Sequence, residues 1–337
     1  MKVLKVIGII VIVILLILVV LGIIAPKMYS VERSITIDSP KELVFNHIKY
    51  WRNWRDWLPW TANDPRMQMT IEGKDGEEGS IFKWVGDPKI TGKGEMTNTG
   101  VKDYEELSYH LHFMEPWESE SDGYVRVADA DGGTKVSWGF YGETPIPWNI
   151  VMLFVSMDKM VGKDFEQGLV LMKELCEKEA KVVLSYEVKR IKFKAKKYAV
   201  IRKEVAISEI KSFFTESFGV IDEARRKKVA RIVGAPAGLY YTWDEQNQIA
   251  DMAAAVPVSK LVNVGEVKSI TLPAAEVYSI DYYGPYSEMA PVYYALDLYL
   301  LKNGLKMKPP VIEEYMTDPE TEPDSSKWLT KVYFFVE

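Results

Sequence analysis

Twenty consecutive apolar residues, from Val6 to Ala25, form the stretch that most restricts how this chain can fold. A helix needs about 20 such residues to cross the hydrocarbon core of a bilayer, and a helix inside a soluble domain is seldom apolar on every face. The run therefore predicts a single-pass transmembrane helix over residues 6–25, with the lipid bilayer as its partner. A cleaved signal peptide is the alternative, although its apolar region is usually about 7–15 residues long, and no small-x-small cleavage site follows Ala25.

The orientation of this helix rests on few charges. Lys2 and Lys5 precede the apolar run, while Lys27, Arg33 and Lys41 follow it. Positive residues favour the cytoplasmic side, and here they are nearly balanced. Because the short amino-terminal tail is basic, we expect a cytoplasmic amino terminus and a body on the outer side, periplasmic or extracellular.

Composition limits what the body can do. The chain has 337 residues, about twice a typical domain, so we expect a membrane anchor over residues 1–30 and two soluble domains over residues 31–180 and 181–337. The net charge of −6 disfavours a nucleic-acid partner, which would need a basic face. Cys176 is the one cysteine, so an intramolecular disulfide and a cysteine metal cluster are excluded. We expect no cofactor.

The first soluble domain shows the pattern of a sheet closed around a helix. Residues 31–37 alternate as a strand, Asp38-Ser39-Pro40 starts a short helix, several strands separated by turns fill residues 67–141, and a long helix is expected from about Val151 to Ala180. Between them stand Trp51, Trp54, Trp57 and Trp60, which could form a core or rim a cavity. His110 and His112 share a strand face, but no third ligand is evident, so we predict no metal site.

The segment Ile35-Thr36-Ile37-Asp38-Ser39-Pro40-Lys41-Glu42-Leu43-Val44-Phe45, with the tryptophans after it, resembles the START-like superfamily of the SRPBCC, polyketide cyclase/dehydrase type. The resemblance covers about residues 31–180. It implies a helix-grip fold with a hydrophobic cavity that could hold an apolar ligand. It implies no particular reaction, because that superfamily includes both enzymes and carriers.

The second soluble domain is predicted to be built twice from strand, helix, strand and strand. The constant offset between Pro236 and Pro310, and between Asp244 and Asp318, indicates a duplication. Two like halves that join their sheets leave a groove at the junction, which is a usual place for a ligand. The predicted fold class is therefore α+β, with a transmembrane helix, a helix-grip domain and a duplicated domain of antiparallel sheet plus helices.

One strand of the second copy, from Pro310 to Asp318, carries two adjacent glutamates. Side chains alternate along a strand, so Glu313 shares a face with Tyr315, whereas Glu314 points the other way. If one face lines a cavity, its glutamate is a buried anion that needs a cation. The alternative is that both glutamates lie solvated at a sheet edge, since glutamate is seldom fully buried unless it is paired.

Three segments of this domain resemble the GyrI-like small-molecule-binding domain, which is also the effector-binding part of AraC-type and MerR-type regulators. They are Gly284-Pro285-Tyr286, the stretch from Pro310 to Pro319, and Leu329-Thr330-Lys331-Val332-Tyr333. The resemblance implies that Glu313 meets cationic ligands in an aromatic pocket, with Glu314 as the substitute if the register shifts by one. The aromatic partners that it implies are Tyr241, Trp243, Tyr283 and Tyr315, with Tyr241 as the repeat mate of Tyr315.

These features favour a membrane-anchored protein that binds an aromatic or cationic small molecule. One alternative is a hydrolase of electrophilic aromatic compounds that uses Glu313 as acid and base, although the sequence lacks a Ser-His-Asp or Cys-His set. Another is a protein-interaction module. No helix-turn-helix pattern is visible in the sequence, which argues against direct transcriptional control.

Overall fold

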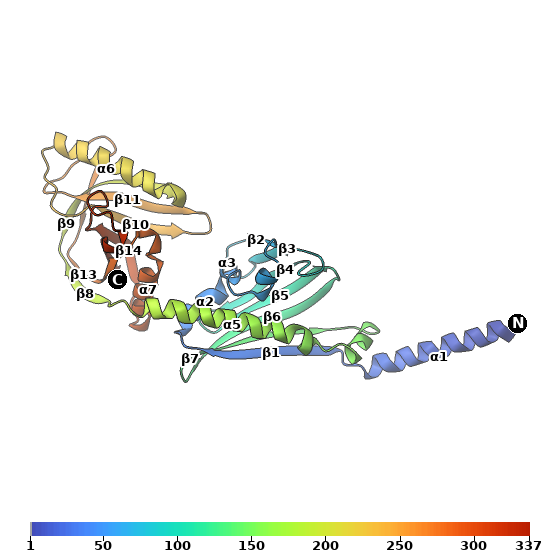
Figure 1. Cartoon of the computed structure of the whole chain (residues 1–337). Helices are drawn as coiled ribbons and strands as arrows, with labels where there is room; N and C mark the ends of the chain where they lie inside the picture. The colour runs from blue at the N-terminus through green and yellow to red at the C-terminus, as the bar shows by residue number, and fades with distance from the viewer. Residues whose placement is uncertain (1) are drawn as a thin grey trace. The chain divides into compact units, whose positions relative to one another are not determined.

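The computed structural model describes residues 2–337, with side chains from Val6 onward. The chain divides into two compact units, one ending at Ala180 and one beginning at Lys181, and each contains one antiparallel sheet (Figure 1). The predicted α+β class, with an amino-terminal apolar helix and two domains of sheet plus helices, is confirmed.

The first unit begins with α1 (Lys2–Ile24), whose segment Val6–Ile24 is long and apolar enough to cross a membrane. Its seven-stranded sheet has the order β1-β7-β6-β5-β4-β3-β2. The strands are β1 (Met28–Ile37), β2 (Gln68–Glu72), β3 (Ile81–Val85), β4 (Lys93–Lys102), β5 (Glu106–Glu115), β6 (Ser119–Ala130) and β7 (Gly133–Glu143). The helices are α2 (Lys41–Lys49), α3 (Trp51–Trp54), α4 (Pro59–Asn63), the 3-10 helix η1 (Trp148–Leu153) and α5 (Met157–Val183).

The long helix begins later than the sequence predicted. α5 starts at Met157 rather than near Val151, and the residues before it form η1. Asn149 explains the break, because its buried side-chain amide donates to the carbonyl oxygens of Gly22 at 2.7 Å and Ala25 at 3.1 Å. η1 is thereby attached to the end of α1 instead of extending α5.

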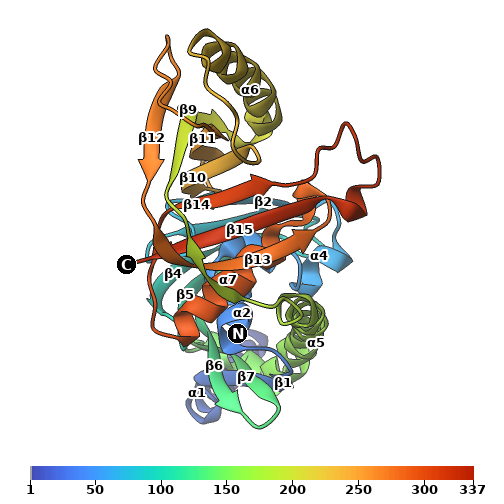
Figure 2. The ribbon, with the colours of Figure 1, turned by 90° about the vertical axis from the view of Figure 1, so that its left-hand side faces the viewer.

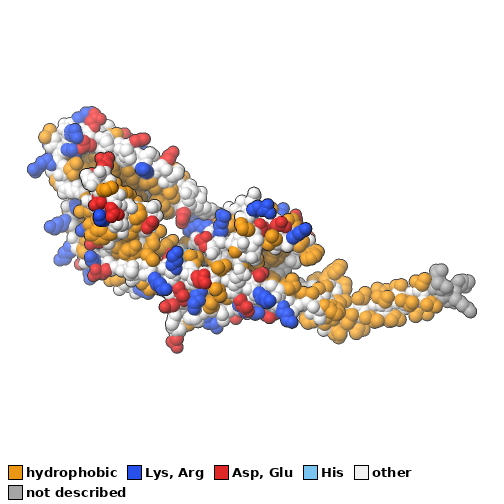
Figure 3. Space-filling view, viewed as in Figure 1, with side chains coloured by type: hydrophobic (Ala, Val, Ile, Leu, Met, Phe, Trp, Pro, Cys, Tyr) orange, Lys and Arg blue, Asp and Glu red, His pale blue; other side chains and the backbone are white. Residues whose placement is uncertain are grey.

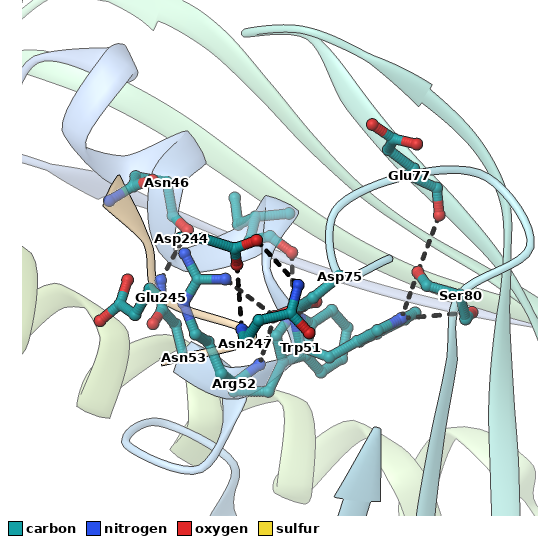
Figure 4. A network of polar contacts seen from close by, with 12 residues as sticks. Asn46, Trp51, Arg52, Asn53, Asp75, Glu77, Ser80, Asp244, Glu245 and Asn247 are labelled. Carbon is teal, nitrogen blue, oxygen red and sulfur yellow. Dashed lines mark hydrogen bonds and ion pairs between the residues drawn. The ribbon is translucent and has the colours of Figure 1, made fainter. Parts of the chain in front are cut away.

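Tryptophans fill the interior of the first unit. Trp51, Trp54, Trp57 and Trp138 are fully buried, and Trp138 of β7 stacks on Phe165 of α5 with 4.1 Å between ring centroids. A buried indole N–H needs an acceptor, and each has one. Trp51 donates to Ser80 Oγ at 3.1 Å, for example, while its backbone N–H donates to Asp75 at 2.7 Å (Figure 4). This packing favours a structural core over a ligand cavity.

The second unit has an eight-stranded sheet in the order β12-β9-β11-β10-β14-β15-β13-β8. The strands are β8 (Lys189–Phe193), β9 (Lys196–Ala206), β10 (Ala237–Asp244), β11 (Ile249–Pro257), β12 (Lys268–Leu272), β13 (Ala275–Tyr283), β14 (Met307–Tyr315) and β15 (Leu329–Val336). Helix α6 (Ile210–Lys227) packs on β9 and β11, and α7 (Ala290–Lys302) packs on β13 (Figure 2). The short 3-10 helices η2 (Ile207–Glu209), η3 (Tyr286–Glu288) and η4 (Ser325–Lys327) complete the unit.

The order strand, helix, strand, strand occurs twice in this unit, as β9-α6-β10-β11 and as β13-α7-β14-β15. The two copies meet where β10 pairs with β14, with Gly238 opposite Glu313 and Tyr240 opposite Val311. In the strand order, α6 packs on strands to one side of this central pair and α7 on a strand to the other side. The junction that the duplication predicted is therefore built around β10 and β14.

Candidate functional site

The Glu313 carboxylate lies at the junction of the two copies, and the residue is only 6% exposed. It accepts hydrogen bonds from three tyrosine hydroxyls, which come from three different elements. Tyr315 of β14 donates at 2.8 Å, Tyr240 of β10 donates at 3.1 Å, and Tyr293 of α7 also donates. Buried polar groups are normally hydrogen-bonded, and these hydroxyls supply the partners of Glu313.

No lysine or arginine in the described part of the chain forms an ion pair with Glu313. Burial raises the pKa of the Glu313 carboxyl above its ordinary value, and the three tyrosine hydrogen bonds oppose that rise. Burial, followed by the charge of Glu313, raises the pKa values of Tyr240 and Tyr293 well above the ordinary range. The hydroxyls therefore remain protonated donors, and among the described residues the Glu313 carboxyl has neutral partners and no cationic one.

Aromatic rings surround the carboxylate and reach the surface. Tyr286 of η3 packs against Tyr315 at 5.2 Å between centroids and against Trp328 at the same distance. Phe214 of α6 meets Tyr315 edge-on at 5.7 Å. Tyr286 is partly exposed, so the aromatic cluster extends from the buried Glu313 carboxyl towards solvent. Figure 3 shows hydrophobic side chains gathered on this unit below α6.

The absence of a side chain at Gly238 leaves space for the rings of Tyr240 and Tyr315 beside Glu313. It pairs directly with Glu313, and a Cβ at this position would lie 2.7 Å from the Tyr315 hydroxyl and 2.9 Å from ring carbons of Phe214 and Tyr240. Real Cβ contacts are not that short, so any larger residue would displace the rings. A glycine is thus required for the approach of both tyrosines to Glu313.

Glu314 lies on the other face of β14 and has a different environment. It is 5% exposed, forms an ion pair with Lys196, and accepts hydrogen bonds from Tyr333 at 3.0 Å and Tyr198 at 3.3 Å. Both glutamates are buried, so the alternative of two solvated edge residues is wrong. Because Glu314 has its own cation, Glu313 is the member of the pair that lacks one.

The structure brings some predicted residues together and separates others. Glu313 and Tyr315 are in direct contact, and Trp243 joins them through Tyr240, whose ring lies 6.2 Å away. Tyr241 points to the opposite face of β10, where the Arg202 guanidinium lies 3.5 Å from its ring centroid. Tyr283 also lies on the opposite face, because its neighbour Tyr282 shares a face with Thr330 and Tyr315. Its side chain is exposed.

The repeat offset explains why Tyr241 lies on the other face of the sheet from Tyr315. Facing residues on paired antiparallel strands share a face, so Gly238 shares a face with Glu313, and Tyr240 shares it with them. The residue numbers of two repeat mates that share this face must then differ by an odd number, as those of Gly238 and Glu313 do. Tyr240, rather than Tyr241, is therefore the mate of Tyr315. A register shift between Tyr240 and Thr242 absorbs the extra residue, which a constant sequence offset could not detect.

Sequence reasoning also missed Tyr240, Tyr293, Phe214 and Trp328 as neighbours of the site. Tyr286 had a signal, because it belongs to the Gly284-Pro285-Tyr286 motif. Tyr293 had none, since it is one of three tyrosines in the apolar helix α7 and nothing in the sequence distinguishes it from the other two. Within residues 2–337, no group of three metal-ligating side chains is found, and His110 and His112 instead contact Asp122 at 3.0 Å and Glu118 at 3.4 Å.

Comparison with solved structures gives partial similarities. The EcmrR C-terminal domain is 18% identical and matches 45% of this chain and 98% of its own, with a TM-score of 0.42. A hydrolase encoded by lin2189 from Listeria innocua is 13% identical and matches 48% and 98%, with a TM-score of 0.35. The Aha1 dimer from Colwellia psychrerythraea is 13% identical and matches 44% and 96%, with a TM-score of 0.32. Nothing about function follows from similarities this low.

Family models match both units. No curated protein matches the chain. Residues 28–177 match the model for polyketide cyclase / dehydrase and lipid transport, and residues 186–337 match the model for the GyrI-like small molecule binding domain. The chain therefore carries a domain of the polyketide cyclase type followed by a GyrI-like domain, as its motifs predicted.

Proposed function

We propose that the GyrI-like domain binds an aromatic cation, with Glu313 as the counter-ion and the surrounding rings as stacking surfaces. The observation that carries this proposal is the contrast between the two adjacent glutamates of β14. Glu314 is paired with Lys196, whereas Glu313 is equally buried and receives only neutral hydroxyl donors. A buried carboxylate without a cation is costly, and a ligand cation would remove that cost.

The rings define the class of ligand. A cation over the face of an aromatic ring gains about 0.5–1 kcal/mol at exposed sites and about 2 kcal/mol or more when it is desolvated. Tyr286, Tyr315 and Phe214 lie around the anion, so a flat ligand could stack on them while its positive group meets Glu313. A purely apolar ligand would leave Glu313 without a counter-ion.

Membrane anchoring is the second part of the proposal. The segment Val6–Ile24 of α1 is apolar along its length and almost wholly exposed, which suits a helix surrounded by lipid better than the core of a soluble domain. We place the body on the outer side of the membrane on the charge argument given above. Recovery of the intact chain in the membrane fraction would support the anchor, and loss of residues 1–25 from the mature protein would overturn it.

The test of the binding site is a titration of the intact, detergent-solubilised chain with cationic aromatic dyes. Glu313→Gln keeps the shape and one of the two acceptor oxygens but removes the charge. Removing one member of a buried charge pair costs about 2–5 kcal/mol, or about 30-fold to several thousand-fold in affinity. Glu216→Gln, at an exposed position of α6, controls for the change in net charge.

Equal affinity of the wild type and Glu313→Gln for every dye would refute the role of Glu313. Analysis of the products of the same incubations distinguishes the hydrolase alternative, because a glutamate beside a tyrosine could also transfer protons. Turnover of an electrophilic aromatic compound that disappears in Glu313→Gln would favour the hydrolase. Binding without turnover would favour a binding protein.

A further inference from the structure

One end of the first unit's sheet is apolar and adjoins α1. The start of β1 and the end of β7 meet there, with Met28 opposite Glu143. The turn between β5 and β6 lies at the same end, and so does the loop between β3 and β4, because Lys93 pairs with both Val85 and Glu115. We call this region, residues 27–28, 85–93, 115–118 and 141–154, the α1 end of the sheet.

Large apolar side chains project from this end. Trp117 is 82% exposed, Phe154 81% and Trp148 69%, and Ile90, Ile146 and Val151 are exposed beside them. A soluble protein rarely exposes such a group without a partner. The opposite end differs, because its turns at residues 73–79, 103–105 and 131–133 are mainly glycine and charged residues. Figure 3 shows hydrophobic side chains gathered where α1 joins the sheet.

The length of chain places this end close to the membrane. α1 ends at Ile24 and β1 begins at Met28, and the three residues between them span at most about 10 Å. The interfacial layer on each side of a bilayer is roughly 5–8 Å thick. Asn149 further attaches η1 to the last turn of α1, so the exposed side chains of η1 start from the end of the apolar helix.

The charges at the α1 end of the sheet indicate which kind of attraction to a lipid bilayer this region favours. Lys27, Lys89 and Lys93 are balanced by Asp87, Glu115, Glu118 and Glu143. Electrostatic attraction to anionic lipid needs a cluster of basic residues, and this region has none. Tryptophan, in contrast, is enriched where the bilayer meets water.

From these observations we propose that the α1 end of the sheet is seated in the interfacial layer of the membrane that α1 crosses, with Trp117, Trp148 and Phe154 inserted among the lipid headgroups. The proposal rests on the membrane anchor proposed above and adds a second membrane contact, outside α1, to it. The first unit is then held against the bilayer at one fixed end rather than suspended from a flexible tether.

The test uses the full chain in phosphatidylcholine vesicles, with an environment-sensitive fluorophore on an introduced cysteine. Cys176 is buried, and burial raises the pKa of its thiol to about 12, so it should not react. Trp117→Cys and Trp148→Cys report on the α1 end, Asp131→Cys on the opposite end, and Val13→Cys on α1. Both tryptophans are exposed, so their replacement removes no core contact, and circular dichroism verifies the fold of each variant.

We expect labels at 117 and 148 to be quenched several-fold more by doxyl-labelled lipid than the label at 131, and to be shielded from aqueous iodide. Added phosphatidylglycerol or salt should change neither result. If the label at 13 is quenched while those at 117 and 148 behave like the label at 131, the seated end is refuted and the anchor stands. If the label at 13 is not quenched, both the anchor and the seated end are refuted.

Discussion

Replacing Glu314 by glutamine should destabilise the second unit, whereas the same change at the adjacent Glu313 should not. Removing one partner of a buried ion pair costs about 3–5 kcal/mol. The Lys196 side chain is 32% exposed, so water partly solvates the ammonium that is left behind, and we expect about 1–3 kcal/mol. For a domain of this size each kcal/mol lowers the melting temperature by about 2–4 °C, which gives a shift of about 5 °C for Glu314→Gln.

The expectation for Glu313→Gln has the opposite sign and depends on pH. Burial raises the pKa of Glu313, so the folded protein keeps this proton to a higher pH than the unfolded chain does. The contribution of this carboxyl to stability is therefore fully present below its unfolded pKa and is lost as the pH rises through its folded pKa. Glutamine keeps one acceptor oxygen for the tyrosines, and its amide N–H can donate to a tyrosine hydroxyl that reorients. It never ionises, so the variant should equal or exceed the wild type in stability at neutral pH.

Calorimetry of the intact chain in detergent, without added ligand, would measure the melting temperature of both variants. The pH would run from about 4 to about 8, because glutamate ordinarily titrates near about 4.3. The advantage of Glu313→Gln over the wild type should grow as the pH rises. A Glu313→Gln protein that melts below Glu314→Gln at neutral pH would refute the reasoning, because Glu313 would then have a cationic partner within the fold.

Two further substitutions test the packing on which the sites depend. Gly238→Ala should lower the free energy of unfolding by about 1–3 kcal/mol through overpacking, because the new methyl group meets Tyr315, Phe214 and Tyr240. It should also weaken dye binding. An unchanged melting temperature and unchanged dye affinity would show that the rings move aside freely. Trp54→Ala should lower the free energy of unfolding of the first unit by about 3–5 kcal/mol, since Trp54 is fully buried among Trp51, Trp57 and Trp138. A well-folded variant that gains affinity for apolar ligands would contradict a purely structural role for these tryptophans.

The sequence was sufficient for the large features and insufficient for the small ones, for physical reasons. The apolar run, the strand alternation and the repeated motifs are averages over many residues, so they predicted α1, the two sheets and the duplication. The position of Tyr240 depends on a single register shift in β10, which no periodicity reveals. Likewise, the start of α5 depends on the long-range contact between Asn149 and α1, which helical spacing within residues 151–180 cannot indicate.

The duplication itself accounts for a single carboxyl group at the junction. Gly238 and Glu313 pair with each other where the two copies meet, so the repeat brings two equivalent positions to one place on one face. The Cβ distances at Gly238 leave no space for a second side chain there. Tyr240 and Tyr315, which are repeat mates, then approach the one carboxylate from the two copies and both donate to it. If the proposed cationic ligand binds at this carboxyl, a symmetric scaffold with one acidic position predicts one such ligand for each GyrI-like domain rather than two.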